Sequence, residues 1–208
     1  VLAASFGDNG QVADQLGKTY TLEVPPEVYK KWMDEGFVYH ITFPVKKPGA
    51  FQFRIAIRDE QGGSIGSASQ FIQVPNLKKK DLTLSSLVLE GMTVDQWKKI
   101  ADASSSVSFE SSSLRDTALR QAKSGTILRY VCEIYNARPS ASGKPDLTGR
   151  IRLIGDGKIL LDGKPQPVTT STDGKRPAFS GAVSLGTQLV PGDYILQMIV
   201  TDNAAPEK

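Results

Sequence analysis

The chain contains few of the residues on which most catalytic and metal-binding sites depend. Its 208 residues include one cysteine, Cys132, and one histidine, His40. A single cysteine excludes an internal disulfide and any metal site built from several cysteines. A single histidine leaves His40 as the one residue through which a Ser-His-Asp or Cys-His mechanism could run.

Long apolar runs and a strong charge of either sign are also lacking. No stretch approaches the roughly 18 consecutive apolar residues of a membrane-spanning helix, and no charged segment followed by an apolar one opens the chain, as it would in a secretory leader. The formal net charge is +3, and the basic residues form only one run, Lys78–Lys80. We therefore expect neither a nucleic-acid partner nor a membrane span. Because the chain begins at Val1 and not at methionine, we interpret it as a processed product or a fragment.

The chemical motifs that are present are weak. His40 alternates within FVYHITF and Cys132 lies at a core-facing strand position, so both are expected to be structural residues. Asp102, Ser104 and Ser106 have the spacing of the metal-ion-dependent adhesion motif, which holds Mg²⁺ through oxygen ligands. That motif follows an apolar strand, however, whereas here WKKIA precedes it and a serine-rich loop follows. We expect no catalytic residue, metal or cofactor, and therefore no enzyme.

Two tryptophans, Trp32 and Trp97, are weak candidates for sugar stacking. Each lies in a short amphipathic segment, where a tryptophan is expected to fix a helical turn against a sheet. Their exposure together on one flat patch would favour a carbohydrate-binding module, whereas their burial would count against it.

Two distant segments repeat one pattern. Residues 48–59 read PGAFQFRIAIRD and residues 191–202 read PGDYILQMIVTD. Proline and glycine favour a turn, and the alternation that follows predicts a strand with one solvated face. The copies lie too far apart for a solenoid or a propeller blade, so the pattern predicts two related domains in tandem.

The two faces of the second copy differ from those of an ordinary half-exposed strand. Its expected inward-facing set is Tyr194, Leu196, Met198 and Val200. The outward-facing set includes Ile195 and Ile199, which we interpret as an interaction surface covered by another domain or chain. The aromatic residue at the strand start resembles a tyrosine corner, although only Tyr194 carries the required hydroxyl.

A turn, an aromatic residue and a long alternating run are typical of the penultimate strand of an immunoglobulin-like sandwich. We therefore predict an all-β fold of two tandem immunoglobulin/fibronectin-like β-sandwich domains, at residues 1–77 and 78–208, with one or two short helices. The helices are expected near residues 25–36 and 94–100. The first domain is expected to hold about six strands, including residues 20–24 and 37–45, and the second to begin with a strand over residues 82–89.

The second domain has no counterpart of the ASQFIQV strand after its repeated segment. A sandwich without its last strand exposes an unpaired edge, which native proteins normally protect. We expect that this strand is either missing or supplied from elsewhere, by the rest of the parent polypeptide or by another chain.

Residues 48–89 resemble the segment that follows the von Willebrand factor type A domain in acidobacterial von Willebrand factor A-related proteins. SGTILRYVCEIYNA and PGDYILQMIVTD are similar to the same C-terminal region, so the resemblance spans most of the chain from about Val28. It implies a secreted or envelope-associated protein in which this chain is an accessory region without the type A domain.

These observations lead to one functional expectation and one alternative. We expect a non-catalytic structural or interaction module that acts as a spacer or makes protein contacts, an expectation that depends largely on fold analogy. The alternative is a carbohydrate-binding or cell-adhesion module.

Overall fold

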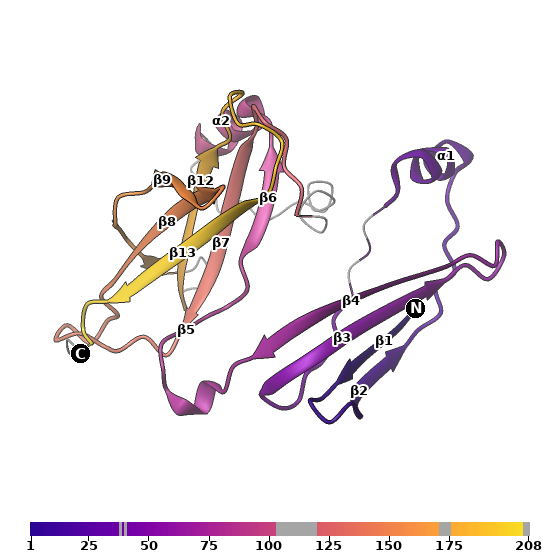
Figure 1. Ribbon diagram of the computed structural model, residues 1–208, viewed down its shortest axis with the longest axis horizontal. Helices are drawn as coiled ribbons and strands as arrows, with labels where there is room; N and C mark the ends of the chain where they lie inside the picture. Colours follow the sequence, from indigo (N-terminus) through magenta and orange to yellow (C-terminus); the bar gives the residue numbers. More distant parts are fainter. Residues whose placement is uncertain (38, 40, 103–119, 171–175, 206–208) are drawn as a thin grey trace. The chain divides into compact units, whose positions relative to one another are not determined.

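The computed structural model describes residues 1–37, 39, 41–102, 120–170 and 176–205. Within these residues the fold is mostly β, with antiparallel sheets and two α-helices (Figure 1). The expectation of a mostly β protein with short helices is therefore confirmed. The contacts divide the chain into unit 1, Val1–Lys79, and unit 2, Lys80–Lys208. This division lies close to the boundary expected after residue 77.

Unit 1 is built on one antiparallel sheet of four strands. The strand order is β2 (Val12–Gly17), β1 (Leu2–Phe6), β3 (Gly49–Arg58) and β4 (Ile65–Val74). β3 is the first copy of the repeat, and it forms a hairpin with β4 in which Phe51 lies opposite Ile72. The repeated strand is therefore an interior strand, with β1 on one side and β4 on the other.

One face of this sheet packs against the segment that joins β2 to β3. Ala3 and Ser5 on β1 are fully buried (0% exposed), and Phe51 on β3 is buried as well. Phe43, in the joining segment, meets Phe53 edge-on with ring centroids 5.0 Å apart. The inward-facing side of the alternation in β3 thus forms the core of unit 1.

The joining segment contains helix α1 (Pro26–Glu35). Proline is favoured in the first helical turn because its missing amide would be unpaired there, and Glu27 complements the helix dipole. At the other end Gly36 has a φ of 73°, and its amide donates to the Trp32 carbonyl oxygen at 2.8 Å. The helix expected near residues 25–36 is confirmed.

The expected number of strands in this unit is wrong. Four strands are present among its described residues, and neither residues 20–24 nor the described part of 37–45 forms one. For residues 37–45, Phe43 explains the difference, because it packs on the face of β3. A segment that lies across the face of a sheet has no strand beside it with which to form backbone hydrogen bonds. It therefore forms no strand, even where its apolar and polar residues alternate.

Unit 2 contains two antiparallel sheets. The first consists of β5 (Thr83–Leu84), β6 (Val88–Met92), β7 (Ile127–Tyr135), β12 (Pro177–Ser184) and β11 (Thr169–Thr170). The second consists of β9 (Lys158–Asp162), β10 (Gln166–Pro167), β8 (Leu147–Gly155) and β13 (Tyr194–Asp202). β13 is the second copy of the repeat, and a turn at Asp156 and Gly157 joins β8 to β9.

The core of unit 2 lies between these two sheets. Buried side chains come from both of them: Tyr130, Ile134, Leu147, Ile151, Leu153, Phe179, Val183 and the neighbouring Leu185. The inward-facing set expected for β13, from Tyr194 to Val200, packs against this cluster. The alternation therefore assigned the core-facing side of β13 correctly.

Two further expectations concern the start of unit 2. The strand expected over residues 82–89 is interrupted, because β5 and β6 pair with different parts of β7 and Ser85 bridges to Glu133 between them. Helix α2 (Val94–Asp102) confirms the helical turn expected near residues 94–100. A capping box begins α2: the Thr93 amide donates to Gln96 Oε1 at 2.8 Å and the Gln96 amide donates to Thr93 Oγ1 at 3.2 Å.

Gly149 on β8 lies against a buried ring, which leads to a stability prediction. A Cβ atom at this position would lie 2.7 Å from Cγ and Cδ2 of Phe179. We expect Gly149→Ala to lower the free energy of unfolding of unit 2 by about 1–3 kcal/mol through overpacking. Gly91→Ala is the matched control, because nothing lies within 4 Å of its added Cβ.

The measurement is urea unfolding followed by tryptophan fluorescence. The chain has two tryptophans, one in each unit, so a Trp32→Phe background leaves Trp97 as the reporter of unit 2. Equal stabilities of the two alanine variants would contradict the close approach of Gly149 to Phe179.

Candidate interaction site

The residues considered for catalysis do not assemble into a site among the described residues. His40 lies outside them. Cys132 is 3% exposed, and its thiol donates to the Ser85 carbonyl oxygen at 3.4 Å. Burial raises the pKa of this thiol, with a smaller opposing effect of the Ser85 hydroxyl. Cys132 therefore packs as a small apolar residue, and the reactive thiolate is disfavoured.

The weak adhesion-type motif is not placed by the structure. Ser104 and Ser106 lie outside the described residues, and so does the side chain of Asp102. Within the part of the chain that the structure describes, no three His, Cys, Asp or Glu side chains are grouped so that they could hold a metal ion.

The two tryptophans lie in separate units. Trp32 is half-buried on α1, where its ring stacks on Phe37 with centroids 4.4 Å apart and an interplanar angle of 23°. Trp97 is half-buried on α2. Each ring therefore lies on a short helix, as the sequence pattern predicts.

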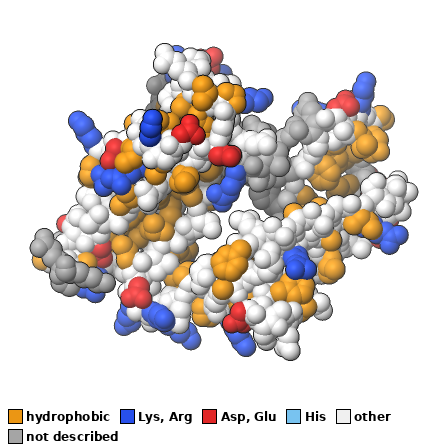
Figure 2. Space-filling view, viewed as in Figure 1, with side chains coloured by type: hydrophobic (Ala, Val, Ile, Leu, Met, Phe, Trp, Pro, Cys, Tyr) orange, Lys and Arg blue, Asp and Glu red, His pale blue; other side chains and the backbone are white. Residues whose placement is uncertain are grey.

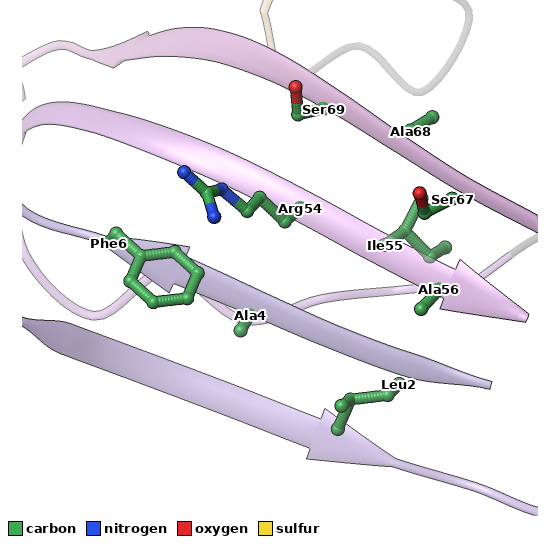
Figure 3. A pocket seen from close by; sticks show the side chains of 9 residues that line it. All are labelled: Leu2, Ala4, Phe6, Arg54, Ile55, Ala56, Ser67, Ala68 and Ser69. Atoms are coloured by element: carbon green, nitrogen blue, oxygen red, sulfur yellow. The ribbon is translucent and has the colours of Figure 1, made fainter.

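A shallow hollow of about 470 Å³ lies on the unit 1 sheet (Figure 3). The side chains of Phe6 and Arg54 point toward one another there, and the guanidinium carbon of Arg54 is 5.0 Å from the ring centroid. Ser67 and Ser69 contribute hydroxyls from β4. The lining includes no histidine or carboxylate that could activate these hydroxyls, so the hollow lacks the groups of a hydrolytic site.

The most distinctive feature of unit 2 is the outer edge of β13. The strand pairs with β8 in continuous register, from Tyr194 opposite Gly155 to Asp202 opposite Leu147. Among the described residues β8 is the only strand paired with it. In an antiparallel sheet, a strand hydrogen-bonds to each neighbour through every second residue. The amides and carbonyls of β13 that do not bond to β8 therefore point to its unpaired edge.

This edge carries none of the features that usually protect edge strands. The sequence YILQMIVTD contains no proline and no lysine, and its one charge is Asp202 at the very end. The pairing with β8 shows no bulge. Short length, charge, proline and bulges are the common means of blocking unwanted pairing. β13 is instead long, regular and apolar.

The ends of β13 are fixed by hydrogen bonds. The Tyr194 hydroxyl donates to the Val190 carbonyl oxygen at 2.6 Å, which is the bond of a tyrosine corner. At the other end Asp202 Oδ2 accepts from the Arg138 amide at 3.0 Å. Because hydrogen bonds hold both ends of β13, its unpaired edge is positioned for pairing with another strand.

The outward face of the same sheet is partly apolar. Ile195 is 63% exposed, whereas Ile199 is half-buried. Ile195 lies opposite Ile154, which in turn lies opposite Ile159 on β9. In the space-filling view, hydrophobic side chains gather over the part of unit 2 in which β8 and β13 lie in Figure 1 (Figure 2). Of the two isoleucines proposed from the sequence, Ile195 is thus the more accessible.

An ion-pair cluster borders these isoleucines on β8 and β9. Asp162 Oδ1 accepts from Arg152 Nε at 3.0 Å and lies 3.4 Å from an Arg150 guanidinium nitrogen. The hydrogen bond from Arg152 is the main reason why the pKa of Asp162 is lowered, and the charge of Arg150 adds to it. The outward face therefore carries isoleucines on β13, β8 and β9 beside a charged cluster on β8 and β9.

Asp202 is the last residue of β13. In the structure its Oδ1 accepts from the Ala204 amide at 3.1 Å, so Asp202 also begins a turn. The signal was available in the repeat, because Asp59 holds the same position in the first copy.

The chain matches no protein-family model, no curated protein and no solved structure. Among the described residues, neither helix has the length and apolarity that crossing a membrane requires. Functional inference therefore depends on the geometry of the molecule itself.

Proposed function

We propose that this chain is a non-catalytic interaction module that joins other protein segments through the open edge of β13. The proposal rests on one observation: β13 is long, pairs with β8 in continuous register, and has no proline, lysine or bulge that would block pairing at its other edge. Strand addition gives affinity through main-chain hydrogen bonds and specificity through alternate side chains, and both need only an accessible edge.

In this proposal the module consists of two related β domains in tandem. Unit 2 is an immunoglobulin-like sandwich of two sheets, and unit 1 is a relative with one sheet among its described residues. In unit 2, the two sheets around one core and the bond from Tyr194 to Val190 support it. In unit 1, support comes from the repeat, since β3 and β13 share a sequence pattern and both lie beside a strand that begins a hairpin. The buried thiol of Cys132 supports the non-catalytic part of the proposal.

The placement of the module in a larger secreted or envelope-associated protein is a separate part of the proposal. It follows from the resemblance to the region beyond the type A domain of acidobacterial von Willebrand factor A-related proteins. In that setting the module would contact the rest of the parent polypeptide or another chain and hold neighbouring parts apart.

The proposal predicts that the isolated chain associates with itself through β13. Ile195→Lys places a charge beside the edge, and we expect it to lower the association constant at least about tenfold, or about 1.4 kcal/mol. Val190→Lys is the matched control, because Val190 is 66% exposed but lies in the loop before the strand. Sedimentation equilibrium over a concentration series measures both effects.

Two results together would contradict this function. One is an original chain that stays monomeric over the whole series. The other is hydrogen exchange of the β13 amides that does not slow when a peptide of residues 64–75, which contains β4, is added.

A further inference from the structure

The sheets that contain the two copies of the repeat share the arrangement on one side of the repeated strand, although β8 also pairs with β10, and they differ on its other side. In unit 1 the order is β2, β1, β3 and β4, where β1 forms a hairpin with β2 and pairs with β3 on its other side. In unit 2, β8 likewise forms a hairpin with β9 and pairs with β13 on its other side. The position next to β13 that corresponds to β4 has no strand among the described residues.

The two repeated strands lead into turns that begin with the same aspartate side-chain bond, although the backbone bond spans four residues after β3 and three after β13. After β3, Asp59 Oδ1 accepts from the Gln61 amide at 3.0 Å, and the Asp59 carbonyl oxygen accepts from the Gly63 amide at 2.9 Å. After β13, Asp202 Oδ1 accepts from the Ala204 amide at 3.1 Å, and its carbonyl oxygen accepts from the Ala205 amide at 3.1 Å. In unit 1 this turn returns the chain along β3 as β4.

From this layout we propose that the open edge of β13 is an acceptor for an antiparallel strand of the β4 type, delivered by the same polypeptide through the turn that begins at Asp202. The inference rests on the proposed function and names the partner of that edge. The occupant is assigned to the same polypeptide because Asp202 begins its turn with the side-chain bond that Asp59 makes where the chain reverses in unit 1.

The register of the added strand follows from the hairpin in unit 1. There Ile72 lies opposite Phe51, on the inward face, and Phe71 lies opposite Gln52, on the outward face. Tyr194 and Ile195 hold these two positions in the second copy of the repeat. The added strand therefore places an apolar side chain beside Tyr194 over the core and a second one beside the exposed Ile195.

A graft within the full chain tests this register. Residues 203–208 are replaced by EQGGSIGSASQFIQVP, the sequence of residues 60–75, so that Asp202 takes the place of Asp59. We expect the β13 amides that do not bond to β8 to exchange at least about tenfold more slowly than in the original chain. The grafted chain should also remain monomeric at concentrations at which the original chain associates.

The control graft has the same length, with proline at the copies of Ala68 and Ser69. Proline removes two adjacent amides, one on each side of the strand, so this graft cannot complete the ladder. The β13 amides of this control should exchange as fast as those of the original chain, and the control should associate to the same extent. The exchange of the β8 amides reports in every variant whether unit 2 is folded.

The possible failures are distinguishable. If the original chain associates through β13 but the first graft leaves exchange and association unchanged, the β4-type strand from the same polypeptide is wrong and the proposed function stands. If the original chain does not associate and neither the strand peptide nor the graft protects β13, both are wrong. Equal protection by the two grafts would also overturn the inferred register.

Discussion

Ile134→Ala is expected to lower the free energy of unfolding of unit 2 by about 2–5 kcal/mol. Ile134 lies on β7 in the cluster between the two sheets and is 1% exposed. The change removes buried apolar surface and leaves a cavity that a close-packed core fills only partly. Urea unfolding followed by Trp97 fluorescence, in the Trp32→Phe background, measures the loss.

The matched control is Ile195→Ala, the same substitution on the outward face of β13. Ile195 is 63% exposed, so its truncation is expected to change stability by less than about 0.5 kcal/mol when the chain is dilute enough to be monomeric. Similar losses in both variants would contradict the assignment of the two faces. A matching loss of stability reported by Trp32, in a Trp97→Phe background, would contradict the division into two units.

Local patterns in the sequence were sufficient to place several elements. Pro26 and Gly36 mark the ends of α1, and the alternation of β13 identifies its core-facing side. These features depend on dihedral preferences and on a period of two, both of which are encoded within a few residues. The repeat was likewise visible because both copies begin with Pro-Gly, a residue and an aromatic, then alternate and close on aspartate.

The misassigned parts depend on contacts between residues distant in sequence. Residues 37–45 alternate as a strand does, yet Phe43 packs on the face of β3. Ile57 follows the inward alternation of β3 but is 52% exposed. Apolar periodicity predicts the face on which a side chain lies, but not how far the covering segment extends over that face. The interruption between β5 and β6 arises from Ser85, whose hydroxyl accepts from the Glu133 amide at 2.9 Å.

The candidate site was predictable in part. The absence of a strand after the second repeat indicated an open edge, and Ile195 was identified on its outward face. The hydrogen bonds of Tyr194 and Asp202, which fix the two ends of β13, required coordinates, because each depends on how the chain turns beyond the strand. These bonds are therefore the part of the candidate site that only the structure shows.

The other large effect on the free energy of unfolding is expected for the ion pair of Glu90 and Arg129, which the sequence alone did not predict. They lie directly opposite one another on β6 and β7, with an Arg129 guanidinium nitrogen 3.2 Å from Glu90 Oε2. Glu90 is 5% exposed, an unusual environment for a carboxylate. Because the two residues belong to strands far apart in sequence, only the register of the sheet brings them together.

Arg129→Met is expected to lower the free energy of unfolding of unit 2 by about 3–5 kcal/mol, because it removes the positive charge from a carboxylate shielded from water. Adding Glu90→Leu to Arg129→Met should restore most of that stability, since an apolar pair of similar volume avoids the cost of desolvating two charges. A double-mutant cycle by urea unfolding measures the coupling. If the two single losses simply add in the double variant, the ion pair does not contribute as a unit. The stability of this sheet would then depend on the packing of β6 against β7 rather than on charge.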